Sequence, residues 1–355
     1  TLVVSSSMPI RDVDGYARAL EPPELDFPRD HGAHPAFRTE WWYVTGNLDS
    51  AAGRRFGVQL VFFRQALAPE TPARDAALAA RDLVFAHAAV TDVDGGRFHH
   101  AERLARRAGG LGEISGGADG APLRVVCADW SALAAPDGDG LLPLDLTAGD
   151  RAFSFTLRVS EGKPMVLQGE RGLSRKSAEP GNASIYYSLT RLPIAGAIEV
   201  GGERHDVAGL AWIDREWSTS ALAADQVGWD WFSLQLDDET EVMWYQLRRA
   251  DSSADPWSRG TFVAVDGTAT PLGPARVRAQ ASGTWTADDG RATYPAAWRL
   301  VGEDPAFDLE VTPLLPDQEL RTLVRYWEGA VAVRGTRAGR PVAGRGYLEM
   351  TGYAR

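Results

Sequence analysis

The chain has 355 residues, enough for two ordinary domains with separate hydrophobic cores. Its 44% hydrophobic and 24% charged residues are typical of a soluble globular protein. The formal net charge of −11 argues against a nucleic-acid partner, because such partners require a basic surface that contacts phosphates.

Several classes of protein are disfavoured by missing motifs. The single cysteine, Cys127, excludes an intrachain disulfide and paired-cysteine zinc or redox motifs. No nucleotide-binding or nucleophile-elbow motif is present, so we expect no cofactor. No apolar run is long enough to span a bilayer. The sequence starts with Thr1 rather than Met, which is compatible with a removed leader.

Near the start of the chain, His31 and His34 form a His-x-x-His pair, and His99 and His100 are adjacent further on. Neither pair has a third ligand at the spacing of a known metal motif. We interpret these side chains as exposed or turn-capping histidines and expect no metal site.

The segment RTEWWYVTG contains Glu40 directly before Trp41, Trp42 and Tyr43. On a strand, Glu40 and Trp42 share one face, and Trp41 and Tyr43 share the other. A carboxylate is costly to bury, so Glu40 is either ion-paired or held dry for chemistry. In the structural alternative, Trp41 or Trp42 stacks on Arg191 and Glu40 pairs with that arginine. Both interpretations stay open.

The next segments are RFGVQLVFF (55–63), a predicted strand, and the Ala-rich PARDAALAARD (72–82), a candidate short helix or lid-like loop. LVFAHAAVT (83–91) predicts another strand, on which His87 shares an apolar face with Phe85. A lone histidine on such a face is more often a hydrogen-bonded core residue than a catalyst.

Strand patterns continue to the end of the chain, separated by Asp-Gly turns, and the 37 Gly and 21 Pro residues leave little room for long helices. We therefore predict an all-β fold of antiparallel barrels or sandwiches. The further predicted strands cover residues 152–159, 184–192, 231–236, 241–249, 260–267 and 329–335.

A domain boundary is expected near residues 190–209, where a strand ends at Leu192 and Gly-rich turns follow. This divides the chain into domains 1–192 and 193–355. Each half then carries one Glu-Trp pair, Glu40 with Trp41 and Glu216 with Trp217, as two copies of one architecture would.

Acids and aromatic residues recur together in the second half, in DREWSTS, GWDWF and MWYQLR. Asp214 and Glu216 share a strand face, as do Trp229 and Trp231, and Tyr245 follows. A carboxyl group in an apolar pocket stays protonated near neutrality and can protonate an alkene. Aromatic faces would stabilise the resulting cation. For Asp214 and Glu216 we favour a functional role over structural ion pairs.

The chain resembles the lipocalin-like AttH family, which includes the bacterial carotenoid 1,2-hydratases and has kievitone hydratase as a fungal relative. The resemblance spans nearly the whole chain. It rests on FPRDHGAHPAFRTEWWYVTGNL (27–48), YYSLTRL (186–192), VAGLAWIDREWSTSAL (207–222), GWDWFSLQL (228–236), DQELRTLVRYWEGAV (317–331) and GRGYLEMTGY (344–353).

The resemblance implies two tandem lipocalin-like, calycin-type antiparallel β-barrel domains, with a ligand pocket expected between them. The named enzymes add water across a prenyl-type double bond, and fungal proteins with a similar fold catalyse pericyclic cyclisations. Carried onto this sequence, the pocket draws on Glu40, Trp41, Trp42, Tyr43, Asp214, Glu216, Trp217, Trp229, Trp231 and Tyr245.

The favoured hypothesis is a cofactor-independent hydratase acting on an apolar isoprenoid or lipid. Asp214 or Glu216 would donate the proton, Glu40 or His87 would orient the water or accept its proton, and the aromatic residues would line the pocket. One alternative is a non-catalytic lipid carrier of the cell envelope, and another is a cyclase. We expect a periplasmic or envelope location, possible peripheral association with a membrane, and no membrane-spanning segment; the cytoplasm is the alternative location.

Overall fold

The computed structural model describes residues 14–69, 81–107, 109–117, 120–220 and 222–354. These residues form twenty-three β-strands and one short 3-10 helix, η1 (Arg29–His31), which confirms the all-β prediction. The helical candidate at 72–82 lies outside the described residues except for its last two, and Asp82 begins a strand. Within the described residues, no helix is long and apolar enough to cross a bilayer.

The first sheet has thirteen strands, and every pairing in it is antiparallel. Its main path runs β4-β3-β2-β1-β13-β12-β9-β8-β7-β6-β5. Its strands are β1 (Thr39–Ser50), β2 (Arg55–Ala66), β3 (Asp82–Asp92), β4 (Arg97–Arg106), β5 (Gly112–Ser115), β6 (Arg124–Cys127), β7 (Trp130–Ala134), β8 (Leu144–Gly149), β9 (Phe153–Val159), β10 (Val166–Leu167), β11 (Leu173–Arg175), β12 (Ala183–Val200) and β13 (Glu203–Ser218).

The second sheet has ten strands, also antiparallel, along the path β17-β16-β15-β14-β23-β22-β20-β19-β18. Its strands are β14 (Gln226–Leu236), β15 (Glu241–Arg249), β16 (Arg259–Val263), β17 (Ala269–Leu272), β18 (Val277–Thr286), β19 (Thr293–Glu303), β20 (Ala306–Pro313), β21 (Glu319–Arg321), β22 (Arg325–Arg337) and β23 (Arg340–Met350).

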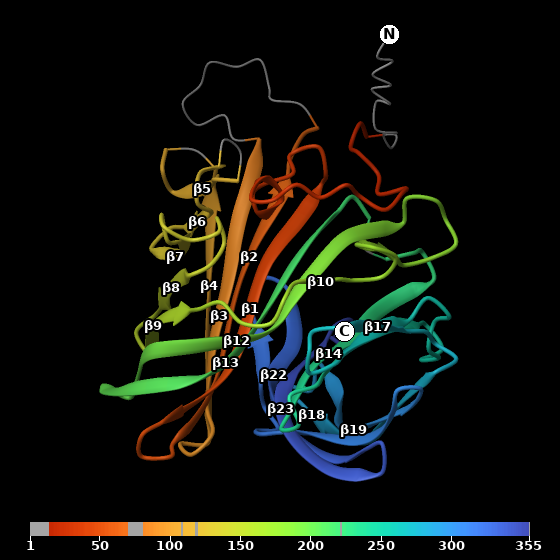
Figure 1. Ribbon diagram of the computed structural model, residues 1–355. Helices are drawn as coiled ribbons and strands as arrows, with labels where there is room; N and C mark the ends of the chain where they lie inside the picture. Colours follow the sequence, from red (N-terminus) through yellow and green to blue (C-terminus); the bar gives the residue numbers. More distant parts are fainter. Residues whose placement is uncertain (1–13, 70–80, 108, 118–119, 221, 355) are drawn as a thin grey trace.

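Each sheet curls around its own hydrophobic core, and a third apolar cluster lies where the two sheets meet. Figure 1 shows the first sheet, in red to green, packed against the second, in teal to blue. Strands such as β1 and β15 are therefore buried on both faces, one toward a barrel core and one toward the other sheet. This arrangement places any cavity between the sheets deep in the molecule.

The strand expected to end at Leu192 instead continues, because β12 runs through this residue to Val200 with a register shift between Leu189 and Leu192. Strand β13 then returns to pair with β12 and β1. The first sheet therefore extends to Ser218 and the second begins at Gln226. The division into domains 1–192 and 193–355 stays a prediction.

Candidate active site

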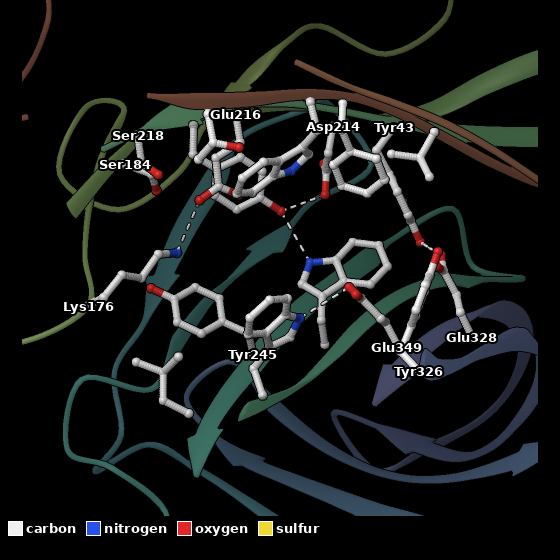
Figure 2. A pocket seen from close by; sticks show the side chains of 18 of the residues that line it. Tyr43, Lys176, Ser184, Asp214, Glu216, Ser218, Tyr245, Tyr326, Glu328 and Glu349 are labelled. Atoms are coloured by element: carbon white, nitrogen blue, oxygen red, sulfur yellow. Dashed lines mark hydrogen bonds and ion pairs between the residues drawn. The ribbon is translucent and has the colours of Figure 1, made fainter. Parts of the chain in front are cut away.

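A cavity of about 340 Å³ lies between the two sheets (Figure 2). Its walls are mostly aromatic, and four carboxyl groups reach it. The lining residues are Thr39, Trp41, Tyr43, Val61, Phe63, Gln65, Lys176, Ser184, Tyr186, Asp214, Glu216, Ser218, Trp229, Trp231, Tyr245, Leu247, Tyr326, Glu328 and Glu349. This volume is within the range of small-molecule sites.

Strand alternation decides which predicted residues reach the cavity. Trp41 and Tyr43 of β1 line it, whereas Glu40 and Trp42 point to the opposite face. In β14, Trp229 and Trp231 line the cavity, as does Tyr245 of β15. Because successive side chains of a strand point to opposite faces, the face assignments made from the sequence hold.

Asp214 of β13 is buried at the cavity wall and accepts hydrogen bonds from three neutral groups. These come from the Tyr186 hydroxyl (2.6 Å), the Ser188 hydroxyl (2.5 Å) and the Trp212 indole (2.7 Å). Burial raises the pKa of Asp214 to about 7, although these hydrogen bonds act in the opposite direction. The group therefore exchanges a proton near neutrality. Tyr186 also accepts a hydrogen bond from Trp231 (3.1 Å), which fixes its orientation.

Glu216 lies two residues further along the same face, next to Lys176. The Lys176 Nζ atom is 3.3 Å from Oε1 of Glu216 and 4.2 Å from the ring centre of Tyr245. Burial acts to lower the pKa of Lys176, but Glu216 and Tyr245 outweigh it, and the pKa is raised. Lys176 thus stays charged, and Glu216 is held as its ion-pair partner.

Glu349 reaches the cavity from β23 in the second sheet. It accepts one hydrogen bond, from the Trp229 indole (3.1 Å). Burial raises the pKa of Glu349 to about 7, and the nearby Glu216 and Asp214 contribute in the same direction. The two sheets thus each contribute an acid that titrates near neutrality.

Glu328 of β22 is the fourth acid and joins the sheets. It accepts hydrogen bonds from the Tyr43 hydroxyl and from Nε2 of Gln59 (2.6 Å), both in the first sheet. Burial raises its pKa well above the usual range, and Glu349 adds to this effect. Burial thus favours the protonated form of Glu328.

His87 of β3 does not line the cavity but contacts a residue that does. Its Nδ1 atom lies 2.8 Å from the Tyr326 hydroxyl, and Nε2 lies 3.9 Å from the half-exposed carboxylate of Glu102. Burial lowers the pKa of His87 to about 4, so the ring is neutral. The side chain connects the cavity wall with a carboxylate near the surface.

Glu40 lies on the far side of β1 in a buried ion-pair network. It contacts Arg64 and, at 2.5 Å, Arg215. Burial acts to raise the pKa of Glu40, but Arg215, His34 and Arg64 outweigh it and hold the pKa well below its usual range. A group so strongly ionised cannot donate a proton.

The arginine that stacks on Trp42 is Arg215, not Arg191 as the structural alternative had it. The Arg215 guanidinium lies 3.8 Å from the ring centre of Trp42, directly across from it in the β1–β13 register. Arg191 is on β12, which does not pair with β1, and it forms an ion pair with Glu241.

Trp217 also lies outside the cavity. It stacks on His34 with ring centres 3.7 Å apart and packs in the first barrel core. His34 forms ion-pair contacts with Asp30 and Glu40, and His31 contacts the Tyr187 hydroxyl. Over the described residues, no group of three or more His, Cys, Asp or Glu side chains is arranged to hold a metal ion.

Sequence reasoning missed several lining residues of the cavity: Lys176, Tyr186, Tyr326, Glu328 and Glu349. Glu328 follows Tyr326 and Trp327, the same acid-beside-aromatic pattern that singled out Glu40, so it was detectable. Lys176 has no such signal, because it lies in a loop after the short strand β11.

The described residues form an all-β protein of two large antiparallel sheets with an acid-lined aromatic cavity between them. The chain belongs to the AttH-like family, whose model matches residues 18–353. A solved structure from Nitrosomonas europaea, described as AttH, is 36% identical, with 95% of this chain and 100% of that chain covered and a TM-score of 0.82.

More distant solved structures share the fold. Kievitone hydratase from Nectria haematococca is 15% identical, with 96% of this chain and 97% of that chain covered and a TM-score of 0.70. CghA in complex with Sch210972 is 13% identical, with 97% of this chain and 98% of that chain covered and a TM-score of 0.55. No curated protein matches the sequence.

Proposed function

We propose that this protein is an enzyme that adds water across a carbon–carbon double bond of an apolar, isoprenoid-type molecule bound between the sheets. The observation that supports this most is the aromatic cavity, into which both sheets place carboxyl groups that have no cationic partner among the described residues. The fold similarity to kievitone hydratase makes hydration the first reaction class to test.

In the proposed reaction, the Asp214 carboxyl group transfers its proton to one alkene carbon. The positive charge on the other carbon is stabilised by the faces of Trp41, Trp229 and Trp231, which line the same cavity. A water oxygen then bonds to that carbon, and the proton released from the water goes to the Glu349 carboxylate. Proton exchange with solvent restores both acids.

The geometry favours Asp214 over Glu216 as the proton donor, because Glu216 is paired with Lys176. The arrangement also favours a positioning role for His87, which contacts Tyr326 rather than the cavity. Glu40 is assigned to support of the site, since it anchors Arg215 beside Asp214 on β13.

A lipid carrier needs no protonated acid inside its cavity. Among the described residues, Asp214, Glu328 and Glu349 have no Lys, Arg or His within ion-pair distance, unlike Glu40 and Glu216. Burying three such carboxyl groups costs free energy, and groups buried in this way are frequent at catalytic sites, which supports the enzyme over the carrier.

The test begins with solvent extraction of the purified protein and mass spectrometry of the released small molecules. The identified molecule is then incubated with the protein in ¹⁸O-labelled water. We expect each product molecule to contain one ¹⁸O atom from the water. The reaction rate should fall by about 100-fold or more in Asp214→Asn and in Glu349→Gln. Asp145→Asn is the control, because Asp145 pairs with Arg158 on the surface.

Two results would contradict the proposal. One is a single unmodified lipid that is never converted, which identifies a carrier. The other is conversion at the wild-type rate in both cavity variants.

A further inference from the structure

Three hydroxyl residues form a row across neighbouring strands at one end of the cavity. Thr39 opens β1, Ser218 closes β13, and Ser184 lies near the start of β12. Ser218 is directly across from Thr39 in the β1–β13 pairing and from Ser184 in the β12–β13 pairing. All three residues line the cavity. We call them the hydroxyl row.

The two serines of the row are buried but unpaired. Ser184 is 1% exposed and Ser218 is 0% exposed, and neither hydroxyl has a hydrogen-bond partner among the described residues. Buried hydroxyl groups normally have such a partner, because leaving one unpaired costs free energy. By contrast, the hydroxyls of Tyr43 and Tyr186 in the same cavity are bonded to acids.

The surroundings of the row indicate the charge of a suitable ligand group. Figure 2 shows Ser184 and Ser218 at the end of the cavity where Lys176 approaches Glu216. The Lys176 ammonium also donates a hydrogen bond to Ser174 (3.1 Å). Because Glu216 already compensates the lysine, an incoming carboxylate would be repelled, whereas a neutral oxygen would not.

We propose that the hydroxyl row binds a neutral oxygen function, a hydroxyl or carbonyl group, of the substrate. Asp214 and Ser218 lie on the same face of β13, four residues and about 13 Å apart. The substrate is then an apolar, unsaturated molecule that is oxygenated at the end remote from its reacting double bond. The position of that double bond rests on the proposed function; the oxygen site does not.

The test compares three isoprenoid probes with one carbon skeleton: geraniol, geranic acid at pH 8, and the parent hydrocarbon. Equilibrium binding is measured by quenching of tryptophan fluorescence. We expect geraniol to bind about tenfold more tightly than the hydrocarbon and more tightly than geranic acid. The double variant Ser184→Ala/Ser218→Ala should lose this preference while its affinity for the hydrocarbon stays unchanged. Ser282→Ala, an exposed serine on β18, is the control.

A melting curve separates a binding role from a structural one. Since the two hydroxyls have no hydrogen-bond partner in the part of the chain that the structure describes, the double variant should melt at or above the wild-type temperature. A lower melting temperature would overturn the inference, as would equal binding of geraniol and hydrocarbon, tightest binding of the carboxylate, or a preference retained in the double variant. A geraniol preference in a protein that hydrates no alkene would reject the proposed function alone.

Discussion

At the scale of single residues, the surroundings of each carboxyl group decide its role. Glu40 contacts two arginines and is held ionised, whereas Asp214 receives only neutral donors and keeps a pKa near neutrality. Glu349 has one neutral donor, an indole. The same functional group is thus an ion-pair anchor on one face of the first sheet and an exchangeable acid between the sheets.

The raised pKa of Glu349 links the stability of the protein to pH. Between its ordinary value of 4.5 and about 7, the folded state binds more protons than the unfolded state. The free energy of unfolding therefore falls as pH rises through this window. Above the window, the destabilisation from burying the ionised Glu349 carboxylate is complete. We expect Glu349→Gln to match the wild type near pH 4 and to be more stable by about 1–3 kcal/mol at pH 8.

Urea unfolding at the two pH values measures this difference. A stability gap that is the same at both pH values would show that folding does not raise the pKa of Glu349. Glu161→Gln, at an exposed position, gives the baseline for a neutralised surface acid.

At the scale of elements, β1 serves two sites with its two faces. Trp42 is 5% exposed, stacks on Arg215 and donates a hydrogen bond to the backbone of His31 (3.0 Å). Trp41, its neighbour, faces the cavity instead. Adjacent residues of the same type therefore belong to a hydrophobic core and to the wall of the cavity.

Alanine substitutions at these two positions should separate stability from binding. Trp42→Ala is expected to lower the free energy of unfolding by about 3–5 kcal/mol, because it empties a packed core position. Trp41→Ala should cost less stability and weaken ligand binding. Chemical unfolding together with titration of the extracted ligand measures both effects, and equal stability losses in the two variants would contradict the assignment of faces.

At the scale of the whole molecule, the two sheets that enclose the cavity approach each other closely at Gly57. Gly57 of β2 is buried against the second sheet: a methyl group there would lie 2.6 Å from Cβ of Ala330 and 2.7 Å from the Tyr347 hydroxyl. The Tyr43–Glu328 and Gln59–Glu328 hydrogen bonds cross the same interface. The spacing of the sheets and the shape of the site are therefore coupled.

Gly57→Ala is expected to force the sheets apart and to lower the free energy of unfolding by about 1–3 kcal/mol, with weaker ligand binding. Calorimetry and ligand titration measure the two effects. Gly273→Ala is the matched control, since an added methyl group there meets nothing within 4 Å. If both variants behave alike, the close approach at Gly57 does not set the spacing.

Local patterns in the sequence predicted the strands and their faces, because alternation is a property of each strand by itself. Asp214 and Glu216 on one face, and Trp229 and Trp231 on another, follow from it. The pairing of strands that lie far apart in the sequence does not follow from this alternation. Arg215 rather than Arg191 meets Trp42 because β13, not β12, pairs with β1.

The meeting of the two sheets was equally hidden from local patterns. Tyr43 and Glu328 bond across a separation of 285 residues, which no local periodicity encodes. The full acid set of the cavity therefore required the tertiary structure, even though Glu328 itself carries the acid-beside-aromatic pattern.

The proposed reaction requires that the cavity hold an acid that is protonated near neutral pH. The most direct measurement is a pH titration of the ¹³C carboxyl shifts of protein labelled only at aspartate, repeated on Asp214→Asn for assignment. We predict a resonance that titrates near pH 7 and disappears in the variant. If the resonance that disappears in Asp214→Asn titrates below pH 5, Asp214 is ionised at neutrality and is not the proton donor.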